Sequence, residues 1–378
     1  MVNRFPFMQM NRSLLALFLL SCAACDSGET KRLPLSGGDL DEILIIVDDR
    51  LKQTPFSDTL IHFFMEPYPV LPQPEPWFQL RIKSFTQWET AGNLLKRYRL
   101  VVFCSNEDDG SPLRKLITGR IEAGISSGRV KRHSDHFYTE RDVYAKPQLI
   151  GYLLGQNETE IIGVLERSRY ELFGIIRGFE NQRLRAATYI SGRNTLAERT
   201  YTAALGWRLE IPQAYFVKAS DTDFVWLADE KLFRDNNNIV VREMKKNLCS
   251  ARIYPHMLNG EMAGRGLDLE SAVRIRNLIS SRYFHGRTRS DAAYVDMAIP
   301  PEFNMIGMDG KKGVEIRGLW RMDNPIMGGP FITWIWQEIE PGSYGMIDAF
   351  AYAAGAEKRP VMRELEFLMQ NVEMTPLQ

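Results

Sequence analysis

Residues 313–354 limit what this chain can fold into more than any other stretch, because they are its most strand-like sequence. Apolar residues alternate there with polar ones such as Arg317, the period expected of a sheet with one covered face and one face in water. Turn-forming residues interrupt the stretch at 324–325, 328–330 and 341–342. The sequence therefore predicts a meander of three antiparallel strands. The apolar positions of its first strand are Val314, Ile316, Trp320 and Met322.

A strand is predicted over 294–299, before this meander, and two amphipathic segments flank the meander. Residues 269–283 and 360–372 carry apolar side chains at helical spacing. On the third predicted strand, Ala349, Ala351 and Ala353 share one face, and such small side chains let a helix approach closely. We expect the final helix to pack on that face.

The first half of the chain predicts a different architecture. Strand-like and helix-like segments, among them a helix predicted over 85–98, alternate between residues 43 and 154. This order predicts right-handed crossovers onto a mostly parallel sheet. A helical pattern then begins after Asn157, a suitable N-cap, and continues to about residue 187. An unbroken helix of this extent would be about 45 Å long, and we expect it to connect two domains.

A chain of 378 residues is longer than one hydrophobic core usually serves. The predicted fold class is α+β: an N-terminal α/β domain with a mostly parallel sheet, a long connecting helix, and a C-terminal domain with an antiparallel meander sheet flanked by helices. The predicted divisions are 1–25 for a signal peptide with its lipobox, 26–40 for a flexible tether, 41–156 for the N-terminal domain, 157–190 for the connecting helix and 195–378 for the C-terminal domain.

The amino terminus has the features of an export signal. Arg4 and Arg12 precede an apolar run at 14–20, and Cys22 follows shortly after it. This pattern predicts cleavage before Cys22 and acylation of its thiol, for example with palmitate; Cys25 is the second candidate. An ordinary cleaved signal or a short membrane anchor is the alternative. We expect a lipoprotein held to the outer membrane by acyl chains, with its body facing the periplasm or the cell surface.

Charge and motifs exclude several classes of protein. Lysine and arginine total 47, as do aspartate and glutamate, so the net charge of zero favours no nucleic-acid partner. Basic clusters at 129–132 and 245–246 are interpreted as solvated faces. No P-loop and no His-Glu-x-x-His motif occurs, and no cofactor is predicted. Outside the signal region only Cys104 and Cys249 remain, and we predict no disulfide between them.

Two groups of residues could hold a metal or a polar ligand. Asp48 and Asp49 directly follow the first apolar strand, at the edge where open parallel sheets bind ligands. Their alternative role is to cap the turn before the next helix. His133, Asp135 and His136 form the closest set of metal-type side chains, and a His-x-x-His pair suits zinc. Because neighbouring lysine and arginine side chains would repel a cation, an exposed loop is the alternative that we favour.

Unusual residues also gather within the meander. Arg317, Trp320 and Met327 lie near Gly328 and Gly329, and glycines let a ligand approach the backbone closely. This group is a candidate ligand-binding surface. The alternative is architectural, with the glycines forming a turn and the tryptophans filling the core. The proline-rich residues 67–76 are predicted to be an extended connector, either a rigid spacer or a cover for a pocket.

Short motifs throughout the mature chain resemble a family of bacterial envelope lipoproteins, known from Bacteroidetes-type bacteria and classed as a domain of unknown function. The resemblance implies an outer-envelope lipoprotein, and it implies no reaction and no catalytic residue. The element order of the second half also resembles the α-β-α sandwich of the Mog1 and PsbP type, an analogy of fold alone. The matching stretches are LPQPEP at 71–76, KPQLI at 146–150, DTDFVWL at 221–227, RGLW at 317–320, MGGPF at 327–331 and KRPVMRELE at 358–366.

These observations favour a lipid-anchored, non-enzymatic envelope protein. We expect it to bind an envelope protein or glycan through the cleft between its domains or the surface around Arg317 and Met327. The alternative is a hydrolase that acts on envelope material with Asp48, Asp49 or the histidines near His133. A hydrolase requires these groups to converge in one concave pocket.

Overall fold

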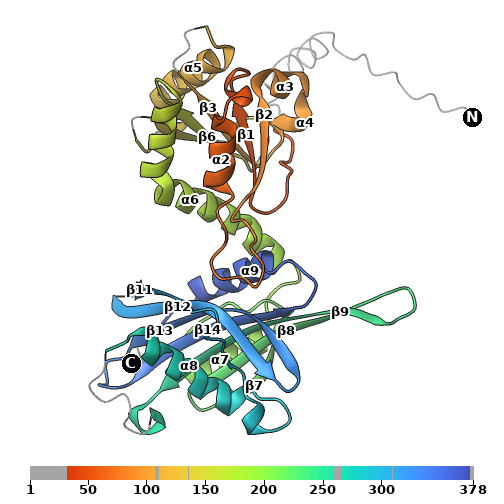
Figure 1. The fold of residues 1–378 in the computed structure, drawn as a ribbon, viewed down its shortest axis with the longest axis vertical. Helices are drawn as coiled ribbons and strands as arrows, with labels where there is room; N and C mark the ends of the chain where they lie inside the picture. The colour runs from red at the N-terminus through yellow and green to blue at the C-terminus, as the bar shows by residue number, and fades with distance from the viewer. Residues whose placement is uncertain (1–31, 107–109, 135, 259–265, 309, 375–378) are drawn as a thin grey trace, which may run out of the picture.

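The computed structural model describes residues 32–106, 110–134, 136–258, 266–308 and 310–374. It contains two domains, each built on one β-sheet and stacked along the long axis of the molecule (Figure 1). Both candidate lipidation sites, Cys22 and Cys25, lie outside the described residues. Within the described residues, none of the helices has both the length and the apolar character needed to cross a membrane.

The N-terminal domain has a six-stranded, mostly parallel sheet in the order β2-β1-β3-β6-β5-β4. The first four strands of that order run parallel, and the last two pair antiparallel. The central strands are buried throughout, as expected for parallel strands covered on both faces. The strands are β1 (Glu42–Val47), β2 (Gln79–Ser84), β3 (Leu100–Ser105), β4 (Val130–Arg132), β5 (Phe137–Arg141) and β6 (Leu149–Leu154).

Helices cover both faces of this sheet. The α2 helix (Phe56–Phe64) and the α6 helix (Glu158–Thr188) pack on one face, and α3 (Phe85–Thr90) and α5 (Pro112–Ser126) pack on the other. The single helix predicted over 85–98 is wrong. It breaks at Gly92, whose φ of 58° is left-handed, and the chain resumes as the short α4 (Asn93–Lys96).

The α6 helix is continuous over 31 residues and begins as predicted, with the Asn157 side chain accepting a hydrogen bond from Glu160 N at 3.0 Å. Residues 34–39, which the sequence assigned to the tether, are hydrogen-bonded along the N-terminal domain. Gly37 N donates to Arg97 O at 2.8 Å, and Lys146 N donates to Pro34 O at 2.8 Å. The ordered body therefore begins before residue 40.

The C-terminal domain is an eight-stranded antiparallel sheet in the order β10-β12-β13-β14-β9-β8-β7, with β11 also paired to β12. The predicted meander is formed by β12, β13 and β14, and the predicted α+β fold class is confirmed. The strands are β7 (Phe216–Asp221), β8 (Phe224–Arg234), β9 (Val240–Ile253), β10 (Tyr294–Val295), β11 (Glu302–Met308), β12 (Lys311–Asp323), β13 (Ile326–Gln337) and β14 (Tyr344–Ala353).

Helices cover both faces of this second sheet as well. The α8 helix (Leu269–Tyr283) packs on the face that carries Trp320, whereas α7 (Thr195–Leu205) and α9 (Arg359–Gln370) pack on the other. As expected, α9 lies on the small residues of β14.

The polar face of β12 is not in water, contrary to the prediction. Glu315 and Arg317 are only 9% and 8% exposed. They are covered because α9 and the proline-rich loop lie on this face: Arg317 Nη2 donates to Glu366 Oε1 at 2.7 Å, and Arg317 Nη1 donates to the Tyr68 hydroxyl at 3.4 Å. The polar face of β12 therefore forms part of the contact between the two domains.

The proline-rich residues 67–76 connect the two domains. They do not form the extended spacer that was predicted, because the loop leaves the N-terminal domain and returns to it, and Tyr68 N donates to Glu75 O at 2.7 Å. Figure 1 shows the loop descending towards α9. There Tyr68 enters the C-terminal core, and the Glu75 carboxylate accepts hydrogen bonds from Lys358 N at 2.7 Å and Arg359 N at 2.8 Å. A carboxylate at a helix N-terminus stabilises the helix.

Buried charges complete the contact between the domains. Glu366 of α9 binds Arg317 of β12 and, at 2.9 Å, Arg177 of α6. One turn earlier on α9, Arg363 pairs with Asp41 of the N-terminal domain at 3.2 Å. Burial alone would raise the pKa of Glu366, but the charges of Arg317 and Arg177 outweigh it and lower the pKa to about 2.

Candidate ligand-binding site

A pocket of about 470 Å³ opens on the α8 side of the C-terminal sheet. It is lined by side chains of β7, β8, β9, β12, β13 and β14, and by the segment that follows α8. Its volume lies within the range of about 300–1,000 Å³ that is typical of small-molecule sites. We call this cavity the aromatic pocket.

Four aromatic rings form its wall. Phe284 contacts Trp226 edge-on with the ring centroids 4.6 Å apart, and it lies 4.9 Å from Phe350. The ring of Trp320 meets Phe350 edge-on at 5.5 Å. Alternate residues of a strand share a face, and for this reason β12 and β14 add Met322 and Tyr352 to the same wall. The result is a continuous apolar surface.

Three polar side chains of the wall are hydrogen-bonded within the protein. Trp226 Nε1 donates to Asn247 Oδ1 at 3.0 Å, and Asn247 Nδ2 donates to Phe350 O at 3.3 Å. Trp320 Nε1 donates to Ala351 O at 3.1 Å. Consequently both indoles and this amide present mainly carbon surface to the pocket.

Cations surround this wall. Lys218 of β7, Lys245 of β9 and Arg287, which follows α8, all line the pocket. The Lys218 ammonium lies 4.6 Å from the centroid of the Trp226 ring, within the range of a cation–π contact. Among the described lining residues, none carries a carboxylate. The electrostatic potential of the pocket is therefore expected to be positive.

The residues of the candidate surface predicted in the meander lie on opposite faces of the sheet. Trp320 and Met327 line the aromatic pocket, whereas Arg317 lies on the opposite face of the sheet. Gly328 and Gly329 allow close strand packing, because a Cβ atom at Gly328 would lie 2.8 Å from Trp320 O and one at Gly329 would clash with Ala351 O. Both glycines thus have an architectural role.

Asp48 and Asp49 accept hydrogen bonds from residues that are distant in the sequence. Ser105 Oγ donates to Asp48 Oδ2 at 2.6 Å, and Ser111 Oγ donates to its other carboxylate oxygen. Thr86 Oγ1 donates to Asp49 Oδ2 at 2.9 Å, in the first turn of α3. Burial disfavours the ionised form of Asp49, but hydrogen bonds with Ser84 and Thr86 outweigh this effect and lower the pKa of Asp49. The Asp49 carboxylate also accepts a hydrogen bond from Thr86 N at 3.2 Å, so it contacts the start of α3 rather than the turn that follows β1, where the alternative placed it.

The predicted histidine group is dispersed. His133 contacts Thr139 at 2.8 Å and Glu171 at 3.0 Å, whereas His136 pairs with Glu160 at 3.2 Å. Asp135 lies outside the described residues. In the part of the chain that the structure describes, no group of three or more His, Cys, Asp or Glu side chains could hold a metal ion.

The groups proposed for a hydrolase do not meet. Asp48 follows β1 and His133 follows β4, and three strands lie between β1 and β4 in the sheet order. Neither residue lines the aromatic pocket or the arginine cleft described next. Residues 124–128 have the pattern Gly-x-Ser-x-Gly, but they end the α5 helix and do not follow a strand, so they form no nucleophile elbow.

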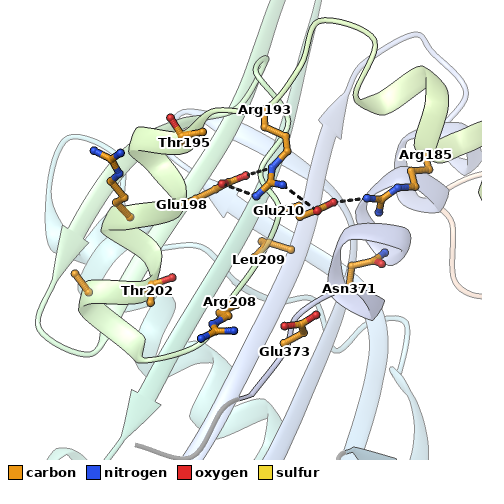
Figure 2. A pocket seen from close by; sticks show the side chains of 12 residues that line it. Arg185, Arg193, Thr195, Glu198, Thr202, Arg208, Leu209, Glu210, Asn371 and Glu373 are labelled. Atoms are coloured by element: carbon orange, nitrogen blue, oxygen red, sulfur yellow. Dashed lines mark hydrogen bonds and ion pairs between the residues drawn. The ribbon is translucent and has the colours of Figure 1, made fainter.

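A second hollow, the arginine cleft, lies where α6, α7 and the end of α9 meet (Figure 2). It is larger, about 910 Å³, but its charges largely neutralise one another. Arg193 binds Glu198 through two hydrogen bonds of 2.7 and 2.8 Å and Glu210 through one of 3.0 Å, and Arg185 also pairs with Glu210. We therefore give the aromatic pocket priority.

Most residues of the aromatic pocket were not predicted from the sequence. Lys245 was interpreted as part of a solvated basic cluster, and Lys246 beside it is buried with Glu364 and Asp229. Alternation along each strand was a usable signal for the faces of Trp226 and Phe350. It did not indicate that β8, β9 and β14 are neighbours.

Fold and site together define a two-domain α+β protein with a pocket suited to a small apolar ligand. Residues 36–189 match the family model described as domain of unknown function (DUF8532), and residues 194–371 match the model described as domain of unknown function (DUF4837). The predicted class of a domain of unknown function is confirmed by these matches. The search of curated proteins found no match.

Solved structures show only distant similarity. The Ran-binding protein Mog1p of Saccharomyces cerevisiae has 6% identity and a TM-score of 0.29, over 46% of this chain and 91% of that chain. A point mutant of Mog1 has 5% identity and a TM-score of 0.28, over 44% and 89%. A protein of Bacteroides thetaiotaomicron VPI-5482 has 7% identity and a TM-score of 0.16, over 45% of each chain. Likeness at this level does not bear on function.

Proposed function

We propose that this protein is a lipid-anchored, non-enzymatic component of the cell envelope that binds a small ligand in its aromatic pocket. The observation that carries the proposal is the pocket itself, with its ligand-sized volume and its wall of four aromatic rings. The sequence alone favoured an envelope protein or glycan as the partner. An apolar wall whose indole and amide groups are already bonded favours a small apolar molecule instead.

Replacing Met327 with tryptophan should obstruct the pocket. We expect the unmodified protein to bind the neutral probe N-phenyl-1-naphthylamine with one-to-one stoichiometry, and M327W to weaken that binding by at least tenfold, about 1.4 kcal/mol. Fluorescence titration of the probe measures both values, and thermal unfolding establishes that the variant is folded.

The matched control is T202W, which places the same side chain in the arginine cleft (Figure 2). This variant should retain the affinity of the unmodified protein. Absence of probe binding, or an equal loss in T202W and M327W, would refute the aromatic pocket as a binding site.

Membrane anchoring is tested separately with the two cysteines of the signal region. We expect C22S to lose the acyl mass from its mature amino terminus and to leave the membrane fraction. C25S should retain both properties, because acylation at Cys22 requires only the residues before it and the cysteine itself. Mass spectrometry of the mature amino terminus provides the measurement, and an unacylated native protein would refute the anchor.

A further inference from the structure

We infer that the ligand of the aromatic pocket is an anion with a flat, apolar body, an inference that rests on the proposed binding function. Three cations, Lys218, Lys245 and Arg287, line the pocket from three separate segments of the chain. No described lining residue opposes them with a carboxylate. By contrast, Glu198, Glu210 and Glu373 line the arginine cleft.

The wall determines what the body of the ligand can be. Sugars and peptides need hydrogen-bond partners, yet Trp226, Trp320 and Asn247 use their polar groups within the protein. Edge-on and tilted rings provide faces on which a planar molecule can lie. An aromatic or other flat apolar body therefore fits this wall better than a polar one.

The lysines stand where the charged end of such a molecule would emerge. The Lys218 ammonium lies over the ring of Trp226, and that of Lys245 lies 6.0 Å from the ring centroid of Tyr352. A ligand stacked on the same wall would bring its acid group close to both ammonium groups. The attraction between the acid group and the two ammonium groups would be stronger in the partly buried pocket than in bulk water.

These cations are available to a ligand. Lys218 pairs with Glu230, and Lys245 pairs with Glu243 at 3.0 Å, and neither glutamate lines the pocket. Partly exposed ion pairs of this kind contribute only about 0–1 kcal/mol, so a lysine can turn to an acid group at little cost. Arg287 lies close enough to Asp291 for its charge to help lower the pKa of that carboxyl group, and Asp291 does not line the pocket.

A matched pair of probes tests the charge of the ligand. 1-Anilinonaphthalene-8-sulfonate has the same ring skeleton as N-phenyl-1-naphthylamine and adds one sulfonate. With the full chain at low salt, we expect the sulfonate to bind about tenfold more tightly than the neutral amine. Added salt should reduce this ratio, because screening weakens charge attraction.

Variants assign the effect to the lysines. The double variant K218M/K245M should bring the affinity ratio of the two probes close to one. The control R199M/R208M removes two positive charges from the arginine cleft and should leave the ratio near ten.

Each outcome separates this inference from the proposed function. If both probes bind equally, or if the neutral amine binds more tightly, the inference about charge is wrong and the binding function stands. If R199M/R208M lowers the ratio as much as K218M/K245M does, the lysines are not the recognition groups and the inference is also wrong. If neither probe binds, the proposed function itself fails.

Discussion

Replacing Arg276 with methionine is expected to lower the free energy of unfolding by about 3–5 kcal/mol. Arg276 of α8 and Asp348 of β14 are 1% and 0% exposed, and Arg276 Nε donates to Asp348 Oδ1 at 2.9 Å. Asp348 also accepts a hydrogen bond from the Thr333 hydroxyl at 2.6 Å. Removing the guanidinium would leave Asp348 as a buried carboxylate without a countercharge. Urea denaturation followed by near-ultraviolet circular dichroism gives the measurement.

Two further variants show whether the lost charge is the cause. R274M changes the same side chain on the same helix, but Arg274 forms a half-exposed pair with Glu270 and its loss should cost at most about 1 kcal/mol. The double variant R276M/D348L removes both buried charges and should recover much of the lost stability. A loss in R276M no larger than that in R274M would contradict the prediction.

Local sequence patterns predicted the elements of this fold well. Period-two alternation identified β12 to β14, and the helical stripes of α8 and α9 appeared with nearly correct ends. Both patterns depend on residues less than about eight positions apart. The strand predicted over 294–299 is the exception. It is reduced to β10, and the next strand, β11, begins only after Pro300 and Pro301, which have no N–H to donate to a ladder.

Contacts between distant segments could not be predicted in the same way. Tyr68 and Glu366 are 298 residues apart in the chain, and no local pattern indicates that a proline-rich loop meets α9. Arg317 had the sequence pattern of a solvated position because burial of a charge depends on its partners. The aromatic pocket was missed for the same reason: Trp226 and Phe350 come from β8 and β14, which are separated by β9 in the sheet.

Glu366→Gln is expected to weaken the contact between the two domains and to cost about 3 kcal/mol at neutral pH. The carboxylate of Glu366 is the shared partner of Arg317 and Arg177, and the Tyr68 hydroxyl donates to it at 3.3 Å. A neutral amide leaves the two arginines close together and without this negative charge. Arg177 belongs to α6 and Arg317 to β12 of the C-terminal domain, so the carboxylate links the two domains. Without this link, we expect the domains to unfold in two separate transitions.

The pH dependence provides an independent measure of the same carboxylate. The pKa of Glu366 falls from 4.5 to about 2 on folding, so the unfolded chain binds the proton more tightly than the folded one. Its stabilisation is therefore complete above pH 4.5 and is lost as the pH falls towards 2. The stability difference between the unmodified protein and E366Q should shrink over this interval. The control E357Q, at an exposed position just before α9, should have the stability of the unmodified protein at every pH. If the stability difference between E366Q and the unmodified protein stays constant as the pH falls, the ionised carboxylate does not hold the domains together.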